Sequence, residues 1–162
     1  MSNGMLDKMP MTALGKQLLD AELKRLMHDE RPSVIKAIEE ARAHGDISEN
    51  AEYEAAKDRQ ALVEGRIAEL QGKIASAEVI IPSQIKSDKI VFGATVKIAD
   101  VEDESQFTYQ IVGLDEADVK AGKISILSPI ARALIGKRGG DVVVVTSPKG
   151  EREYKILSFE FV

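Results

Sequence analysis

The strongest structural signal in this chain lies in residues 53–77, YEAAKDRQALVEGRIAELQGKIASA. Mostly apolar side chains recur there at alternating steps of three and four residues, which is the spacing of a heptad seam. The seam positions are Tyr53, Ala56, Gln60, Val63, Ile67, Leu70, Ile74 and Ala77. Gly65 and Gly72 fall on the opposite face, where a missing side chain removes no packing. We therefore predict a helix over residues 49–79, about 45 Å long at 1.5 Å per residue.

A partner helix is predicted upstream, beginning after the N-cap candidate Thr12 and ending near Ala43. Its apolar positions form two triplets with the same spacing, Leu19, Leu23 and Leu26, then Val34, Ile38 and Ala41. Arg31-Pro32 lies between the triplets. Because proline lacks the backbone N–H and clashes with the preceding turn, we predict a kink or a brief break there.

The connection between the two helices is short, AHGDIS at residues 43–48. Gly45 suits the left-handed position that ends the first helix, and Asp46 or Ser48 can cap the second. So short a connection makes the helices antiparallel. We predict a flexible N-terminus at residues 1–11 and an all-α antiparallel coiled-coil hairpin at residues 12–80.

From Ile81-Pro82-Ser83 onward the pattern changes to the alternation typical of strands. The candidate strands are residues 94–98, 107–113, 124–127, 141–146 and 151–161. A helix over residues 128–137 interrupts them, with serine at its N-cap, proline at its first position and glycine near its end. We predict a linker at residues 81–90 and, at residues 91–162, an α+β domain of mostly antiparallel sheet with one helix.

Composition excludes several classes of protein. The 162 residues contain no cysteine and two histidines, so neither a disulfide framework nor a soft-ligand metal site is expected. No apolar run approaches the roughly 20 residues that span a bilayer, and MSNGMLDKMP lacks the apolar core of a signal peptide. We expect a cytoplasmic protein without a membrane partner. The net charge of −5 also argues against free binding to nucleic acid.

Charge is segregated within the C-terminal half. Residues 99–119 contain seven acids and no base, and residues 120–140 contain five bases and no acid. Two interpretations stay open. The segments are ordinary solvated loops, or they form a docking face of two signs for a large partner.

The connection and the start of the second helix contain the most informative acids, Asp46 and Glu49, three residues apart. They fit a capping box, and they also fit half of a Mg²⁺ site, since that ion takes one or two carboxylates and completes its shell with water and phosphate. Such a site becomes useful only if another protein supplies the rest. Nearby Arg42, Lys57 and Arg59 are candidates for phosphate contacts, or members of a solvated helix face.

Several segments, in order along nearly the whole chain, resemble bacterial transcript-cleavage factors of the Gre family. They are PMT at 10–12, ARAHGDISENAEY at 41–53, VFGATV at 91–96, YQIVG at 109–113, DEAD at 115–118 and SPIARALIGK at 128–137. The resemblance implies an N-terminal coiled coil followed by an FKBP-like domain. It also implies a transcription elongation factor that binds bacterial RNA polymerase at the rim of the secondary channel.

The resemblance further implies how such a factor works. It is not an enzyme itself, but stimulates the polymerase's hydrolysis of the 3′ end of backtracked nascent RNA. Asp46 and Glu49 correspond to the family's tip acids, which help hold a Mg²⁺ ion shared with the polymerase and orient the attacking water. Arg42, Lys57 and Arg59 are then candidates for RNA contact, and we expect a functional monomer. The candidates for polymerase docking are Ser128, Pro129, Ile130, Arg132 and Lys137.

Two alternatives remain. A channel inhibitor with the same fold would compete for the polymerase without promoting cleavage, and the intact Asp46 and Glu49 argue against it. A free-standing peptidyl-prolyl isomerase would need an aromatic-lined proline pocket. The aromatic residues of the C-terminal half, which strand cores could absorb, are Phe92, Phe107, Tyr109, Tyr154, Phe159 and Phe161.

Overall fold

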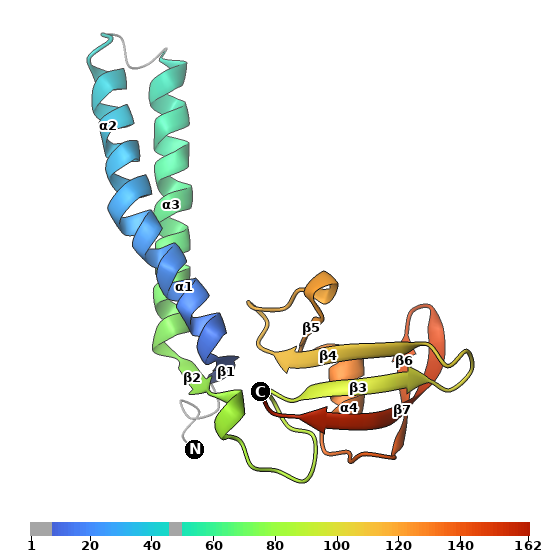
Figure 1. Ribbon diagram of the computed structural model, residues 1–162. Coiled ribbons are helices and arrows are strands. Elements are labelled where there is room, and N and C mark those ends of the chain that lie inside the picture. Colours follow the sequence, from blue (N-terminus) through green and yellow to red (C-terminus); the bar gives the residue numbers. More distant parts are fainter. Residues whose placement is uncertain (1–7, 46–49) are drawn as a thin grey trace, which may run out of the picture. The chain divides into compact units, whose positions relative to one another are not determined.

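The computed structural model describes residues 8–45 and 50–162. The chain divides into two compact units, one formed by Gln17–Ser76 and the other by Met1–Lys16 together with Ala77–Val162. The first unit is a helical hairpin and the second is built on a β-sheet (Figure 1). A helical N-terminal part followed by a mostly antiparallel sheet domain is therefore confirmed.

The sheet unit contains five strands in the order β5-β4-β3-β7-β6. Their bounds are Thr95–Asp100 (β3), Gln106–Val112 (β4), Lys123–Ser125 (β5), Val142–Ser147 (β6) and Gly150–Glu160 (β7). Neighbouring strands are antiparallel except for β4 and β5, which are parallel. All five predicted strands are present, and alternation along β3 buries Val96, Ile98 and Asp100.

One helix, α4 (Pro129–Leu134), packs on this sheet. Ser128 is its N-cap, and its hydroxyl accepts a hydrogen bond from the amide of Ala131 at 3.2 Å. Ala131 and Leu134 are fully buried in the core that α4 shares with β3, β4, β6 and β7. The predicted serine cap and proline start are confirmed, and the helix ends at Leu134, three residues before the predicted end at residue 137.

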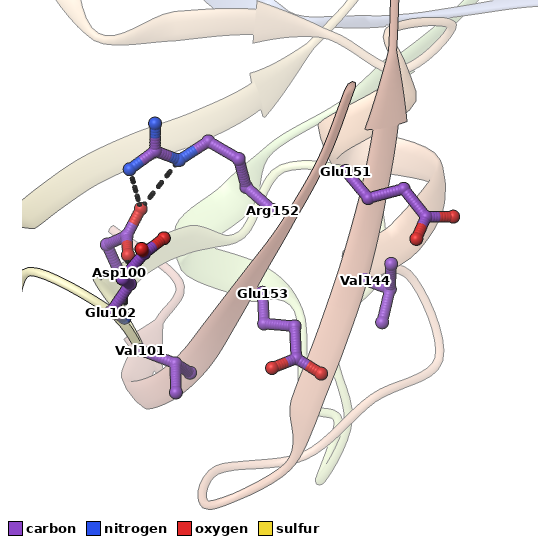
Figure 2. A pocket seen from close by; sticks show the side chains of 7 residues that line it. All are labelled: Asp100, Val101, Glu102, Val144, Glu151, Arg152 and Glu153. Carbon is purple, nitrogen blue, oxygen red and sulfur yellow. Dashed lines mark hydrogen bonds and ion pairs between the residues drawn. The ribbon is translucent and has the colours of Figure 1, made fainter. Parts of the chain in front are cut away.

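A buried carboxylate, that of Asp100, connects a turn to the sheet. Asp100 at the end of β3 accepts hydrogen bonds from the Arg152 side chain at 2.8 and 2.6 Å (Figure 2). Burial alone would raise the pKa of Asp100, but the amides of Glu102 and Asp103 and the guanidinium of Arg152 together hold that pKa below its ordinary value. Because its partners lie within the turn after β3 and on β7, Asp100 fixes that turn to the sheet.

A parallel strand pair, β1 (Met9–Thr12) with β2 (Ala77–Ile80), also belongs to the sheet unit and is absent from the sequence-based prediction. Residues 9–11 are thus part of a strand rather than of a flexible N-terminus. The predicted second helix stops short of residue 79 because its last residues pair with β1. The hydroxyl of Thr12 donates to the buried carboxylate of Glu116, which also accepts from Lys123 at 3.1 Å.

The segment predicted to be a linker, residues 81–90, contains a short 3₁₀ turn, Pro82–Gln84, and ends in the core. Ile90 is fully buried and exchanges backbone hydrogen bonds with Gly136 and Lys137 at 2.7 and 2.8 Å. This part of the chain is therefore packed on the sheet unit.

The hairpin has one interrupted arm and one continuous arm. The first arm consists of α1 (Ala13–Arg25), a π-helical turn η1 (Leu26–Glu30) and α2 (Arg31–Arg42). The second arm is α3 (Ala51–Ala75), about 38 Å long at 1.5 Å per residue. Thr12 caps the first arm as predicted, since its hydroxyl accepts from the amide of Gly15 at 3.0 Å.

The predicted seam holds the two arms together. Its buried members are Leu19, Leu26, Val34, Ile38 and Ala41 in the first arm and Ala56, Val63, Ile67 and Leu70 in the second. Each lies at a position that the three-and-four spacing assigns to the seam. Burial of such side chains contributes about 25 cal/mol per Å² of apolar surface, so the seam is the main source of stability in the hairpin.

The π turn explains how the apolar seam continues across an irregular spacing between Leu26 and Val34. Leu26 and Val34 are eight residues apart, and Ser33, at the seven-residue heptad position, is exposed whereas Val34 is 1% exposed. The amide of Arg31 donates to the carbonyl of Leu26, five residues earlier. A π turn inserts one residue into a helix, and that residue returns Val34 to the seam. The irregularity predicted at Arg31-Pro32 is thus a π turn directly before it.

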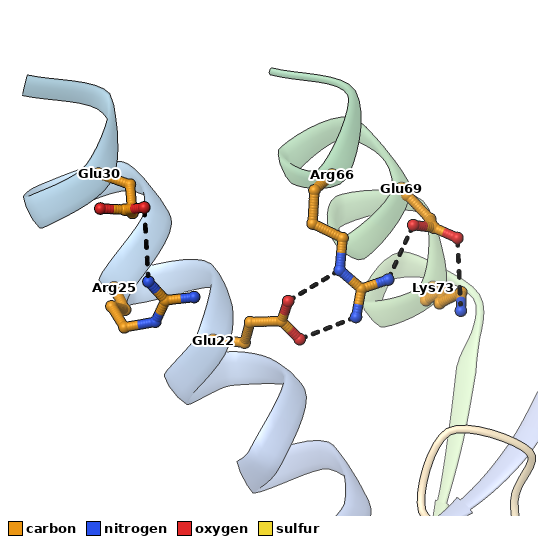
Figure 3. A network of polar contacts seen from close by, with 6 residues as sticks. All are labelled: Glu22, Arg25, Glu30, Arg66, Glu69 and Lys73. Atoms are coloured by element: carbon orange, nitrogen blue, oxygen red, sulfur yellow. Dashed lines mark hydrogen bonds and ion pairs between the residues drawn. The ribbon is translucent and has the colours of Figure 1, made fainter. Parts of the chain in front are cut away.

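Ion pairs flank the seam (Figure 3). Arg66 on α3 donates two hydrogen bonds of 2.8 Å to Glu22 on α1 and a third of 2.8 Å to Glu69. Arg31 reaches Glu64 in the same two-bond manner at 2.8 Å. Hydrogen bonding to Arg66 lowers the pKa of Glu22 below its ordinary value. Exposed ion pairs contribute little to the free energy of unfolding. The main effect of these bidentate pairs is therefore to help fix the register of the two arms.

The glycines of α3 give a first prediction. Gly65 and Gly72 lie inside the helix, and a Cβ atom at either position would meet no atom within 4 Å. Gly65→Ala and Gly72→Ala should each raise the free energy of unfolding by about 0.5–1 kcal/mol, because alanine loses less backbone entropy in a helix. Denaturant unfolding followed by circular dichroism measures this. Gly113→Ala should act oppositely, since its Cβ would lie 2.7 Å from the carbonyl oxygen of Pro10.

The Glu22–Arg66 pair gives a pH prediction. A carboxylate whose pKa is lower in the folded state stabilises the fold above its unfolded pKa, and this contribution is lost as pH falls through the folded value. The wild-type hairpin should therefore lose more stability than Glu22→Gln between about pH 6 and pH 3. Parallel urea titrations across this range measure the difference. Equal losses in the two proteins would show that the pair does not stabilise the hairpin.

Candidate functional site

The candidate site lies where the two arms of the hairpin are joined. Asp46 and Glu49, the predicted catalytic and metal-binding residues, lie outside the described residues. The structure describes the chain on both sides of them. The first arm ends at Arg42, and Gly45 has a φ of +100°, which is the left-handed conformation predicted for it.

Asn50 is the N-cap of the second arm, which corrects the prediction that Asp46 or Ser48 caps it. The side-chain oxygen of Asn50 accepts a hydrogen bond from the amide of Tyr53 at 3.1 Å. The capping box assigned to Asp46 and Glu49 therefore does not apply to α3, which begins at Ala51. Capping of α3 therefore does not account for this pair of acids.

Side chains from both arms meet at this end of the hairpin. The Asn50 amide donates to the backbone carbonyl of Ala41 at 2.7 Å. The guanidinium carbon of Arg42 lies 5.8 Å from the centre of the Tyr53 ring, within the range of a cation–π contact. Nδ1 of His44 lies 3.2 Å from a carboxylate oxygen of Glu52. The ends of α2 and α3 are therefore tied together by three contacts.

The three predicted RNA-binding residues lie in the same region, but their side chains differ in the contacts they already make. Arg42 is exposed while it stacks on Tyr53, and Lys57 is exposed with its ammonium 3.1 Å from the side-chain oxygen of Gln60. Arg59 reaches back to Glu30 on the first arm at 3.4 Å. Arg42 and Lys57 thus remain the better placed of the three for contact with phosphate.

The predicted docking residues lie on and just after α4. Ser128 is occupied as the helix cap, and Ile130 packs partly buried against the sheet core. Pro129, Arg132 and Lys137 have exposed side chains. These three are the exposed members of the predicted set of five.

Some of the acids in the charge-segregated segments form ion pairs within the sheet unit. Of the seven acids in residues 99–119, Asp100 and Glu116 are buried, and each is paired with a base. Asp103 also contacts Arg152, at 3.5 Å. A docking face of two signs would therefore contain fewer free charges than the sequence suggests.

A shallow hollow of about 510 Å³ lies beside the Asp100–Arg152 pair (Figure 2). Its lining residues are Asp100, Val101, Glu102, Val144, Glu151, Arg152 and Glu153. Within residues 8–45 and 50–162, no group of three or more histidine, aspartate or glutamate side chains could hold a metal ion. No helix in this part of the chain is long and apolar enough to cross a membrane.

Sequence reasoning missed Asn50 as a residue of this site. An Asn three residues before Tyr53 is an ordinary cap signal, but Asp46 and Ser48 carry the same signal. What distinguishes Asn50 is a second hydrogen bond to the opposite arm, which no local pattern contains.

The chain is thus a two-unit protein, in which a helical hairpin precedes a unit built on a five-stranded sheet. Two models of one protein family cover the chain. The model described as "Transcription elongation factor, N-terminal" matches residues 9–79, and "Transcription elongation factor, GreA/GreB, C-term" matches residues 85–161.

Curated relatives agree along nearly the whole length. The chain is 59% identical over 152 residues to transcription elongation factor GreA of Hyphomonas neptunium, covering 94% of this chain and 97% of that protein. It is 54% identical over 156 residues to GreA of Acidiphilium cryptum, covering 96% and 99%. The crystal structure of GreA factor homolog 1 (Gfh1) of Thermus thermophilus is 28% identical, with a TM-score of 0.43 and coverage of 94% and 99%. The chain belongs to the GreA/GreB family of transcription elongation factors.

The α4 cap gives a testable prediction. Ser128→Ala removes the acceptor for the Ala131 amide and should lower the free energy of unfolding by about 1 kcal/mol. Ser128→Asp keeps an acceptor and should lose much less. Arg132→Ala, on the exposed face of α4, should change stability by less than about 0.5 kcal/mol. Denaturant unfolding of the three variants measures this, and a Ser128→Ala protein as stable as wild type would contradict it.

Proposed function

We propose that this elongation factor docks at the rim of the secondary channel of bacterial RNA polymerase and stimulates the polymerase's own hydrolysis of backtracked RNA. The observation that carries the proposal is the identity of 54–59% along nearly the whole chain to proteins named transcription elongation factor GreA. Cleavage would create a new 3′ end in register with the active site, so that a stalled complex resumes elongation.

Asp46 and Glu49 are the residues to which we assign the chemistry. Since Asn50 caps α3, neither carboxylate is needed for capping. Two carboxylates are a partial oxygen shell of the kind that suits Mg²⁺, with water and phosphate as the other ligands. When bound, the ion would activate a water molecule and stabilise the developing negative charge. The carboxylates would help to hold that ion and orient the water, while the polymerase and the RNA complete the site.

The basic residues beside the acids would guide the RNA. Arg42 and Lys57 are exposed and close in sequence to the junction of the arms, so they could contact phosphates of the extruded 3′ segment. Arg59, tied to Glu30, would contribute less. Such contacts position the RNA without reading its sequence.

The sheet unit is proposed as the docking module, with an FKBP-like arrangement of its strands. Pro129, Arg132 and Lys137 are its candidate contacts because they are exposed on or beside α4. We propose that the factor acts in the cytoplasm as a monomer, and that nucleic acid meets it only within the polymerase complex. The net charge of −5 then presents no obstacle, since the polymerase supplies most of the grip on RNA.

Stalled elongation complexes with 5′-labelled RNA test the proposal. Wild-type protein should cause rapid Mg²⁺-dependent shortening of the RNA from its 3′ end. Asp46→Asn and Glu49→Gln should each lower the cleavage rate by about 100-fold, because each removes a ligand charge at the shared ion. Binding to polymerase, measured by competition, should not change.

Glu54→Gln is the matched control, because it removes one negative charge from the first turn of α3 without touching the proposed ligands. It should cleave like wild type. If the Asp46→Asn, Glu49→Gln double variant also cleaved like wild type, the assignment of these acids would be wrong. Binding to polymerase without any cleavage by the wild-type protein would instead indicate a channel inhibitor.

A further inference from the structure

The Asn50 side chain uses both ends of its amide at the junction of the hairpin arms. Its oxygen accepts from the amide of Tyr53 within α3, and its nitrogen donates to the carbonyl of Ala41 in α2. The second bond is 2.7 Å long, and Ala41 is 2% exposed. The bond is part-buried, with Asn50 itself half-buried.

An ordinary N-cap needs only an acceptor. Serine, threonine and aspartate all cap helices, but none offers an N–H that could reach the opposite arm. Asparagine provides an acceptor and a donor in one rigid group. The Ala41 carbonyl also accepts a hydrogen bond from the backbone amide of His44 at 3.2 Å, so the Asn50 side chain adds a second donor, from the opposite arm, to the last turn of α2.

The neighbouring contacts act in the same place. Arg42, the last residue of α2, stacks on Tyr53 in the first turn of α3, and His44 approaches Glu52. Both contacts involve exposed or partly exposed groups and are individually weak. The Asn50–Ala41 bond, at 2.7 Å, is the shortest of the three contacts.

We infer that Asn50 is a positioning residue for transcript cleavage: its amide fastens the end of α2 to the start of α3, the two helix ends that flank Asp46 and Glu49 in the sequence. The inference rests on the proposed function of Asp46 and Glu49. Catalytic groups must be held close to their productive geometry, and a displacement of about 1 Å can cost about 100-fold in rate. Asn50 acts on the connection between the arms and touches neither RNA nor metal.

Two substitutions separate positioning from capping. Asn50→Ser keeps a neutral cap acceptor but cannot reach Ala41, and Asn50→Ala removes both functions. If the bond to Ala41 matters, both variants should lower the maximal cleavage rate by about tenfold or more. The factor concentration for half-maximal cleavage should stay the same, because the docking surface is untouched. The Mg²⁺ concentration for half-maximal cleavage should rise.

Gln71→Ser, an exposed amide elsewhere on α3, is the matched control and should cleave like wild type. Circular dichroism should show that Asn50→Ser keeps its helix content. An Asn50→Ser protein with the wild-type maximal rate and Mg²⁺ dependence would overturn the inference and leave Asn50 as a cap only. A wild-type protein that stimulates no cleavage would contradict the proposed function itself and remove the basis of the inference. The two failures are thus distinguishable.

Discussion

The apolar seam between the arms of the hairpin is the constraint on which the functional geometry depends. Leu26 and Val34 can both enter it only because the π turn between them inserts one residue and restores the phase of the helix. The same phase places Ala41 opposite Asn50. A slip of one residue along either arm would turn apolar side chains to solvent and separate the groups that join the arms. The register of the seam therefore sets the geometry of the candidate site.

Charged side chains form two kinds of ion pair in this protein: exposed pairs between the hairpin arms and pairs with buried acids in the sheet unit. On the hairpin, bidentate pairs such as Glu22–Arg66 connect the arms at their exposed edges and help to select the register. In the sheet unit, the buried acids Asp100 and Glu116 are consumed by internal partners, so they are not available to a docking partner. Asp46 and Glu49, to which the chemistry is assigned as a proposal, lie elsewhere in the sequence, between the two arms of the hairpin.

Much of the fold follows from local patterns. The heptad spacing identified the seam, and serine followed by proline identified α4. The pair β1 and β2 could not be predicted, because four-residue strands carry little alternation and their pairing joins residues 9–12 to 77–80. The Thr12–Glu116 contact joins residues 104 positions apart, so no local sequence pattern predicts it. Asp46, Ser48 and Asn50 all carry a cap signal in the sequence, and only the hydrogen bond from the Tyr53 amide identifies Asn50 as the cap. The assignment of Asp46 and Glu49 stays a prediction from the sequence, whereas the contacts between the helix ends that flank them required the structure.

The account predicts that the junction of the hairpin arms reaches the RNA 3′ end inside the polymerase. A photo-crosslinking amino acid in place of Lys57, an exposed residue of α3 close in sequence to Asn50, would measure this in defined elongation complexes. In backtracked complexes, the crosslink should form to the 3′-terminal nucleotides of the RNA. A crosslink confined to the outer surface of the polymerase, with none to RNA in any complex, would contradict the account.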